Sequence, residues 1–293
     1  MRWRLSPALS RCAGPHNRPV SRTTFTRYVA LGDSLTEGLC DTSRMEPGRY
    51  RGWADRLAGL LATGAPTGGP LRYANLAVRS KTVSDVVRTQ LPAALRLRPD
   101  IVSILIGAND LVRITVDPAA LVAELGEGIA QLRERGCDVL LVTPFLPQRA
   151  ASRLFARRFA VFNSGLRSLA AAHGAMLLDL DAVPRMGQTD LWAADRVHLR
   201  SSGHRYLAYR AAEVLGVPDA HALGGLDAAL HGFDPDAIDE DAPAPGLWLT
   251  RDALPWAWRR LRGRTAGDGR EPKHRGYVDI AGGGASFART DPS

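Results

Sequence analysis

The chain has 293 residues and a formal net charge of +8, with 45% hydrophobic and 23% charged residues. This is the ordinary profile of a globular protein, and it excludes a collagen-like, a disulfide-scaffold or a wholly disordered chain. Because no apolar stretch approaches the roughly 20 residues that a membrane-crossing helix needs, we expect no membrane-spanning role.

The positive charge lies at the two ends of the chain. Residues 1–27 carry six arginines and no acidic residue, and residues 251–293 carry nine basic and five acidic residues. The middle of the chain is slightly acidic, with 23 basic and 25 acidic residues. The net charge therefore describes two appendages, and since no nucleic-acid-binding motif accompanies them we expect no nucleic-acid partner.

The cysteines are few and unevenly spaced. Cys12, Cys40 and Cys137 form neither a disulfide framework nor a Cys-x-x-Cys pair. Such a set is typical of a reducing compartment, so we expect a cytoplasmic protein without a metal site. Residues 1–26 lack the apolar run of a secretory signal and are interpreted as a basic, disordered leader.

From residue 27 onward, short apolar runs alternate with helical patterns. The apolar runs predict strands at residues 28–31, 71–73, 100–106, 138–142 and 175–180. Apolar residues at three- and four-residue spacing predict helices at about 53–61, 83–91, 118–136, 153–173 and 202–216. This alternation predicts an α/β domain over residues 27–218, a three-layer α/β/α sandwich with a five-stranded parallel sheet.

The pattern weakens after residue 218. Residues 219–245 are rich in acidic residues, alanine, glycine and proline, and are interpreted as an acidic linker. Residues 246–293 form a Trp/Arg-rich segment whose last twenty residues have the composition of a disordered end. We expect residues 248–264 to pack against the sandwich. The alternative interpretation is that this segment makes a weak contact with an anionic membrane surface.

Polar residues follow four of the predicted elements at the point where ligands bind in an open α/β sheet, the carboxyl ends of the strands. They are Gly32-Asp33-Ser34, Asn75 with Ser80 further along its loop, Gly107-Ala108-Asn109-Asp110, and Asp195-Arg196-Val197-His198. Each cluster alone is a weak signal. Together they predict one polar site at a single edge of the sheet.

Three of these residues suit nucleophilic catalysis. A serine hydroxyl needs a base within hydrogen-bond reach, and His198 can serve Ser34 in this way. Asp195, three residues before His198, can hold the imidazole in the required orientation. The order Ser, Asp, His is that of α/β-hydrolases, but their G-x-S-x-G motif is missing around Ser34.

The combination of blocks resembles the SGNH, or GDSL, hydrolase family of esterases and lipases. The resemblance rests on the Gly-Asp-Ser of residues 32–34, Asn75, the Gly-x-Asn-Asp of residues 107–110 and the Asp-x-x-His of residues 195–198. It covers about residues 27–216 and implies a flavodoxin-like sandwich.

The resemblance also implies the roles of the site residues. Ser34 would be the nucleophile, His198 its base and Asp195 the residue that orients the base. The oxyanion hole would consist of the backbone N–H of Ser34, the backbone N–H of Ser80 and the side-chain amide of Asn109. Ser80 stands where the family usually has glycine, and a positive φ there would cost serine about 1–2 kcal/mol.

The resulting expectation is a cofactor-free, monomeric serine hydrolase that cleaves a small-molecule, lipid or carbohydrate ester through an acyl-enzyme. The same triad would serve an acyltransferase or a carbohydrate deacetylase. A non-catalytic protein that binds a membrane or an acidic partner is the third alternative. The loops around the site carry no signature that identifies the acyl or alcohol part of the substrate.

Overall fold

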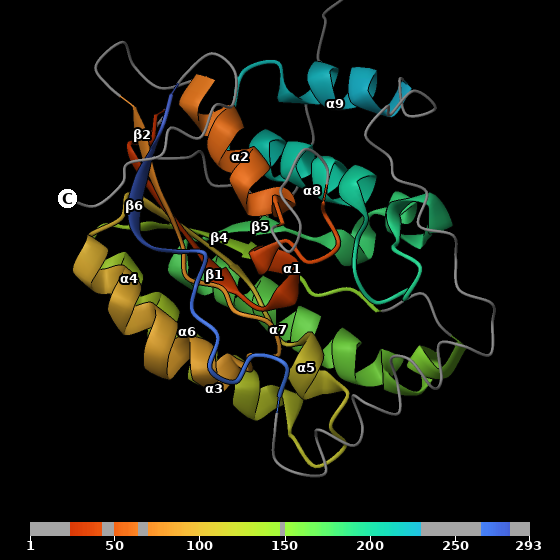
Figure 1. Ribbon diagram of the computed structural model, residues 1–293. Coiled ribbons are helices and arrows are strands. Elements are labelled where there is room, and N and C mark those ends of the chain that lie inside the picture. Colours follow the sequence, from red (N-terminus) through yellow and green to blue (C-terminus); the bar gives the residue numbers. More distant parts are fainter. Residues whose placement is uncertain (1–23, 43–49, 64–69, 147–149, 230–264, 282–293) are drawn as a thin grey trace, which may run out of the picture.

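The computed structural model describes residues 24–42, 50–63, 70–146, 150–229 and 265–281. A six-stranded sheet, with strand order β5-β4-β3-β1-β2-β6, forms its centre (Figure 1). The strands are β1 (Arg27–Gly32), β2 (Leu71–Asn75), β3 (Ile101–Leu105), β4 (Asp138–Val142), β5 (Met176–Leu178) and β6 (His274–Ile280). The first five are parallel to one another in the 2-1-3-4-5 order of flavodoxin-like sheets.

Helices cover both faces of this sheet. They are α1 (Ser34–Glu37), α2 (Gly52–Thr63), α3 (Val83–Asp85), α4 (Leu91–Leu97), α5 (Ala108–Leu111), α6 (Pro118–Glu134), α7 (Ala156–His173), α8 (Ser201–Val214) and α9 (Ala220–Ala229). A π-helical turn, η1 (Val86–Gln90), joins α3 to α4, and four 3-10 turns lie at Ala150–Phe155, Leu180–Ala182, Pro184–Gly187 and Thr189–Leu191. Helices α2 and α8 pack on one face, and α4, α6 and α7 pack on the other (Figure 1).

The strands are apolar on both sides because both sides are covered. Along β1, Tyr28 and Ala30 join the core beneath α2 and α8, whereas Val29 and Leu31 join the core on the opposite face. Near-continuous apolar runs of this kind are typical of parallel strands between two helical layers. The predicted α/β/α sandwich is therefore confirmed.

The sheet has one strand more than the five that were predicted. β6 pairs antiparallel with the edge strand β2, with Ile280 opposite Leu71. Lys273, just before β6, fastens it by donating to the buried carboxylate of Asp55 at 2.5 Å. The expected boundary at residue 218 and the expected disorder of residues 274–280 are corrected accordingly. This edge strand is half-exposed and carries charged residues, so it lacks the apolar run that marks the central strands.

Residues at both ends of the predicted domain are folded beyond its expected bounds. α9 occupies the first part of the region interpreted as an acidic linker, because its alanines are good helix formers. Phe25 is buried in the core and Thr26 bonds to Asp100, so the last residues of the expected leader are folded. Residues 1–23 and 248–264 lie outside the described residues.

Among the described residues, no helix combines the length and the apolar character that crossing a membrane requires.

Candidate active site

The candidate nucleophile sits at the junction of β1 and α1. Ser34 is the first residue of α1 and is half-buried, so its hydroxyl stays accessible. Gly32 precedes it with φ at 151°, and a Cβ there would lie 2.4 Å from the carbonyl oxygen of Leu105. Only glycine fits this turn. The carboxyl group of Asp33 accepts a hydrogen bond from the Leu35 amide at 3.1 Å and caps the start of α1.

The turn at Gly32 is held in place by two hydrogen bonds with a glutamine side chain. The side-chain amide of Gln90 accepts from the N–H of Gly32 and donates to its carbonyl oxygen, both at 2.9 Å. Gln90 is buried and belongs to the π-helical turn η1. Turns of this kind are frequent at functional sites. The sequence alone did not single out Gln90, because 58 positions separate it from Gly32.

The Asp-x-x-His block forms a tight loop that is organised by its own aspartate. One carboxylate oxygen of Asp195 accepts from the amides of Val197 and His198, both at 2.9 Å. The intervening Arg196 has a left-handed φ of 56°, and the amide of Ala193 donates to the carbonyl of His198. Aspartate readily forms turns of this kind by bonding to the backbone two residues on.

The three residues that the family resemblance identifies form one hydrogen-bonded chain. The second carboxylate oxygen of Asp195 lies 2.5 Å from Nδ1 of His198, and Nε2 of His198 lies 3.0 Å from Oγ of Ser34. Burial disfavours the ionised Asp195, but the hydrogen bonds and charge of His198 outweigh burial and lower the pKa of Asp195 to about 2. Asp195 is therefore an anion beside the imidazole at neutral pH.

The two further oxyanion-hole candidates are Asn109, in α5, and Ser80, in the loop between β2 and α3. Asn109 donates through Nδ2 to the Asp33 carboxyl group and to the Lys81 carbonyl oxygen, both at 3.1 Å. This places its amide between the nucleophile turn and the loop that carries Ser80. Ser80 has φ at 65°, which is the left-handed conformation that favours glycine.

Asp33 itself has an unusual electrostatic environment. It is 2% exposed, and burial raises its pKa to about 7, although the hydrogen bond from Leu35 acts in the opposite direction. The carboxyl group directly next to the candidate nucleophile thus titrates near neutral pH.

Two other polar residues of the blocks lie next to the candidate site and hold its loops in position. Asn75 donates to the carbonyl oxygen of Thr36 at 2.9 Å and so ties β2 to α1. Asp110 is buried and accepts from the Val83 amide at the start of α3. Both residues fix loops against one another.

His204 lies inside α8, and its contacts make it a packing residue. Its Nδ1 atom accepts from the Trp53 amide at 3.2 Å, and its Nε2 atom faces the carbonyl oxygen of Leu39 at 3.1 Å. Complete burial lowers the pKa of His204 to about 4, so the ring is neutral. It fastens the segment after α1 to α8.

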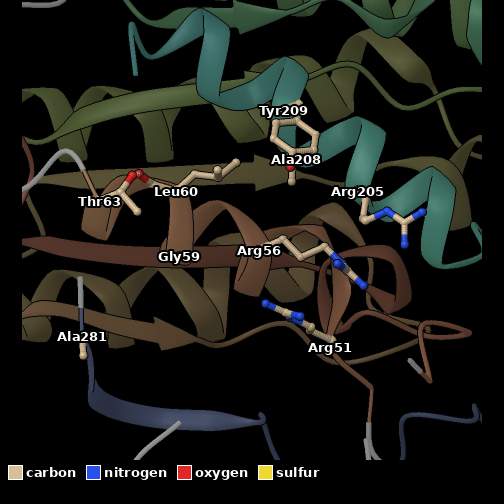
Figure 2. Close-up of a pocket in the computed structure, with 9 residues that line it drawn as sticks. All are labelled: Arg51, Arg56, Gly59, Leu60, Thr63, Arg205, Ala208, Tyr209 and Ala281. Atoms are coloured by element: carbon tan, nitrogen blue, oxygen red, sulfur yellow. Dashed lines mark hydrogen bonds between the residues drawn. The ribbon is translucent and has the colours of Figure 1, made fainter. Parts of the chain in front are cut away.

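A pocket of about 220 Å³ lies elsewhere, between α2 and α8 (Figure 2). None of its lining residues belongs to the candidate triad; they are Arg51, Arg56, Gly59, Leu60, Thr63, Arg205, Ala208, Tyr209 and Ala281. Arg56 forms an ion pair with the buried Asp41 at 2.9 Å, and Asp41 also accepts from the hydroxyl of Ser201 at 2.6 Å. Arg56 and Ser201 therefore anchor the segment after α1 through Asp41. The pocket is separate from the candidate active site.

Comparisons with solved structures support the fold. The chain is 23% identical to LAE5, an α/β hydrolase from the metagenome of Lake Arreo, Spain, with a TM-score of 0.55, and the match covers 66% of this chain and 95% of LAE5. A catalytic mutant of Axe2, an acetylxylan esterase from Geobacillus stearothermophilus, is 21% identical with a TM-score of 0.52, covering 66% and 95%. TesA is 25% identical with a TM-score of 0.52, covering 64% of this chain and 97% of TesA.

The family assignment comes from a match to a family model. A search of curated proteins gave no match. The model of the GDSL-like lipase/acylhydrolase family matches residues 30–206, which is more than half of the chain and spans all four polar blocks. The chain therefore belongs to the GDSL-like lipase/acylhydrolase family.

Proposed function

We propose that this hydrolase cleaves carboxylic esters with Ser34 as nucleophile, His198 as general base and Asp195 as the residue that orients the base. The observation that carries the proposal is the chain of hydrogen bonds from Asp195 through His198 to Ser34, with heavy-atom distances of 2.5 and 3.0 Å. These distances lie within the reach that proton transfer between nucleophile and base requires.

In the first half of the reaction, Nε2 of His198 takes the proton of the Ser34 hydroxyl while Oγ attacks the ester carbonyl carbon. The Asp195 carboxylate, 2.5 Å from Nδ1, stabilises the imidazolium that forms. The backbone amides of Ser34 and Ser80 and the side-chain amide of Asn109 are proposed to donate to the oxyanion. Each donor of this kind typically contributes about 10²–10³-fold to turnover.

In the second half, the C–O bond to the alcohol breaks and the alcohol leaves with the proton from His198. The acyl group then remains on Ser34 as an ester. His198 takes a proton from water, which attacks this acyl-enzyme, and the imidazolium returns the proton to Oγ as the carboxylic acid leaves. No cofactor takes part in these proposed steps.

The test is a Ser34→Ala variant assayed with p-nitrophenyl acetate and butyrate. We expect the rate of hydrolysis to fall by about 10³-fold or more, because the acyl-enzyme cannot form. Ser168→Ala is the matched control, since Ser168 is exposed on α7 and bonds only locally to the Ser164 carbonyl oxygen. Full activity of Ser34→Ala would refute the assignment.

The acyl-enzyme is also the point at which the alternative uses diverge. An alcohol acceptor in place of water would make the protein an acyltransferase, and an acetylated sugar as substrate would make it a carbohydrate deacetylase. Product analysis with alcohol acceptors and acetylated sugars separates these uses. A substrate panel graded by acyl length then identifies the acyl part.

A further inference from the structure

A cysteine lies beside the candidate triad. Helix α1, which begins with Ser34, is capped at its C-terminal end by Gly38 with φ at 96°, and Cys40 follows with a left-handed φ of 72°. The chain turns back here so that Cys40 Sγ, a carboxylate oxygen of Asp195 and a ring nitrogen of His198 all lie within 4.8 Å of one another. The sequence did not reveal this cluster, because Cys40 belongs to none of the four blocks.

The three side chains provide the ligand types that zinc prefers. Zn²⁺ binds thiolate at about 2.3 Å and imidazole or carboxylate at about 2.0–2.2 Å, which places tetrahedral ligands about 3.3–3.6 Å apart. Separations near the upper bound of 4.8 Å therefore have to contract by about 1.5 Å at most. The 2.5 Å between Asp195 and Nδ1 of His198 has to widen by about 1 Å if Nδ1 is the ligand atom. All three residues are only partly buried, with 18% of the His198 side chain and 25% of the Asp195 side chain exposed, so an ion can reach them from solvent.

We propose that Cys40, Asp195 and His198 form a zinc-binding site whose occupation switches the hydrolase off. On binding, the Cys40 thiol releases its proton and the thiolate becomes a ligand. A zinc ion on Nδ1 of His198 replaces the hydrogen bond with Asp195, and a zinc ion on Nε2 replaces the contact with Ser34. In either arrangement the imidazole can no longer accept the proton of the nucleophile.

The inhibitory part of this inference rests on the proposed function, whereas zinc binding itself does not. The experiment therefore measures both on the purified full-length protein after removal of chelators. Calorimetric titration with zinc chloride should show one ion per chain, and p-nitrophenyl acetate hydrolysis should fall in parallel with occupancy and return with excess EDTA. Ser34→Ala should hydrolyse nothing yet bind zinc like the wild type, which separates failure of the catalytic assignment from failure of the metal site.

The decisive variant is Cys40→Ser, which removes one ligand while leaving the triad intact. It should retain hydrolysis and lose about tenfold or more of the zinc affinity. Cys137→Ala, in the buried core, and Cys12→Ser, outside the described residues, are the matched controls and should bind zinc like the wild type. If the circular dichroism spectrum shows that Cys40→Ser does not fold like the wild type, the same measurements are made on Cys40→Ala. Unchanged zinc affinity in the folded Cys40 variant, or full hydrolysis by the zinc-saturated wild type, would overturn the proposal.

Discussion

The side-chain amide of Asn109 donates a hydrogen bond to the buried carboxyl group of Asp33 at 3.1 Å, across 76 positions of the chain. This contact joins the third polar block to the residue that immediately precedes Ser34. It also means that an ionisable group with a pKa of about 7 supports both the nucleophile turn and a candidate oxyanion donor. Protonation of Asp33 thus affects the stability of the site near neutral pH.

The raised pKa of Asp33 gives a pH-dependent prediction for stability. The folded protein holds the Asp33 proton up to about pH 7, whereas the unfolded chain releases it near 3.8, so this contribution to stability is lost as the pH rises between these values. The free energy of unfolding of Asp33→Asn relative to the wild type should therefore rise by about 2–3 kcal/mol from pH 5 to pH 8. Urea unfolding at both pH values measures this difference.

The comparison between two pH values removes a complication of this variant. Asparagine at position 33 also changes the contact with Asn109, but an amide does not titrate, so that effect is the same at both pH values. A stability difference between variant and wild type that stays constant from pH 5 to pH 8 would show that Asp33 is ionised throughout.

The role of Asp195 predicts a large effect on turnover with little effect on the fold. In Asp195→Asn the remaining side-chain oxygen can still accept from the Val197 and His198 amides, but the charge that stabilises the imidazolium is gone. We expect kcat to fall by about 10³–10⁴-fold. Asp181→Asn, on an exposed turn, is the control for loss of a negative charge. Steady-state kinetics and circular dichroism decide the matter, and near-normal kcat in a folded Asp195→Asn would exclude this role.

Ser80 offers a prediction in the stabilising direction. Its φ of 65° costs serine about 1–2 kcal/mol that glycine avoids, although glycine loses more backbone entropy on folding. Ser80→Gly should therefore raise the stability by about 0.5–1 kcal/mol and retain activity, since the backbone N–H persists. Ser168→Gly, inside α7, should instead lower the stability by a similar amount. Thermal unfolding of the two variants side by side gives the answer, and a less stable Ser80→Gly would contradict the account.

The two hydrogen bonds between Gln90 and Gly32 predict that replacing Gln90 lowers the stability even when the side-chain volume is kept. Gln90→Met keeps most of the side-chain volume but leaves the buried N–H and carbonyl of Gly32 without these two hydrogen bonds. Leaving two such groups unsatisfied should cost about 2–4 kcal/mol. Chemical denaturation measures the loss, and a drop in kcat should accompany it because Ser34 lies two residues further on. A Gln90→Met protein as stable as the wild type would show that the turn holds without Gln90.

The sequence predicted the sandwich and indicated the candidate site residues because their signals are local. The apolar strands and the polar residues at their carboxyl ends are visible in short windows, and parallel topology brings those ends to one edge of the sheet. Ser34, Asn109 and His198 all follow from this rule together with the family resemblance.

What the sequence did not reveal depends on long-range packing. Gln90 lies inside a helical pattern, and only the folded chain places it against Gly32. Cys40 belongs to no motif, and its approach to His198 follows from a left-handed turn that cysteine rarely adopts. β6 has a half-exposed, charged sequence whose strand conformation is stabilised by pairing with β2.

The central claim is that Ser34 is a nucleophile activated by His198, and covalent labelling tests it most directly. The purified protein is treated with a fluorophosphonate probe, digested and analysed by mass spectrometry. The account predicts one adduct, on the peptide that contains Ser34, and strongly reduced labelling in His198→Ala. An adduct on a different serine, or no adduct on the folded wild-type protein, would contradict the account.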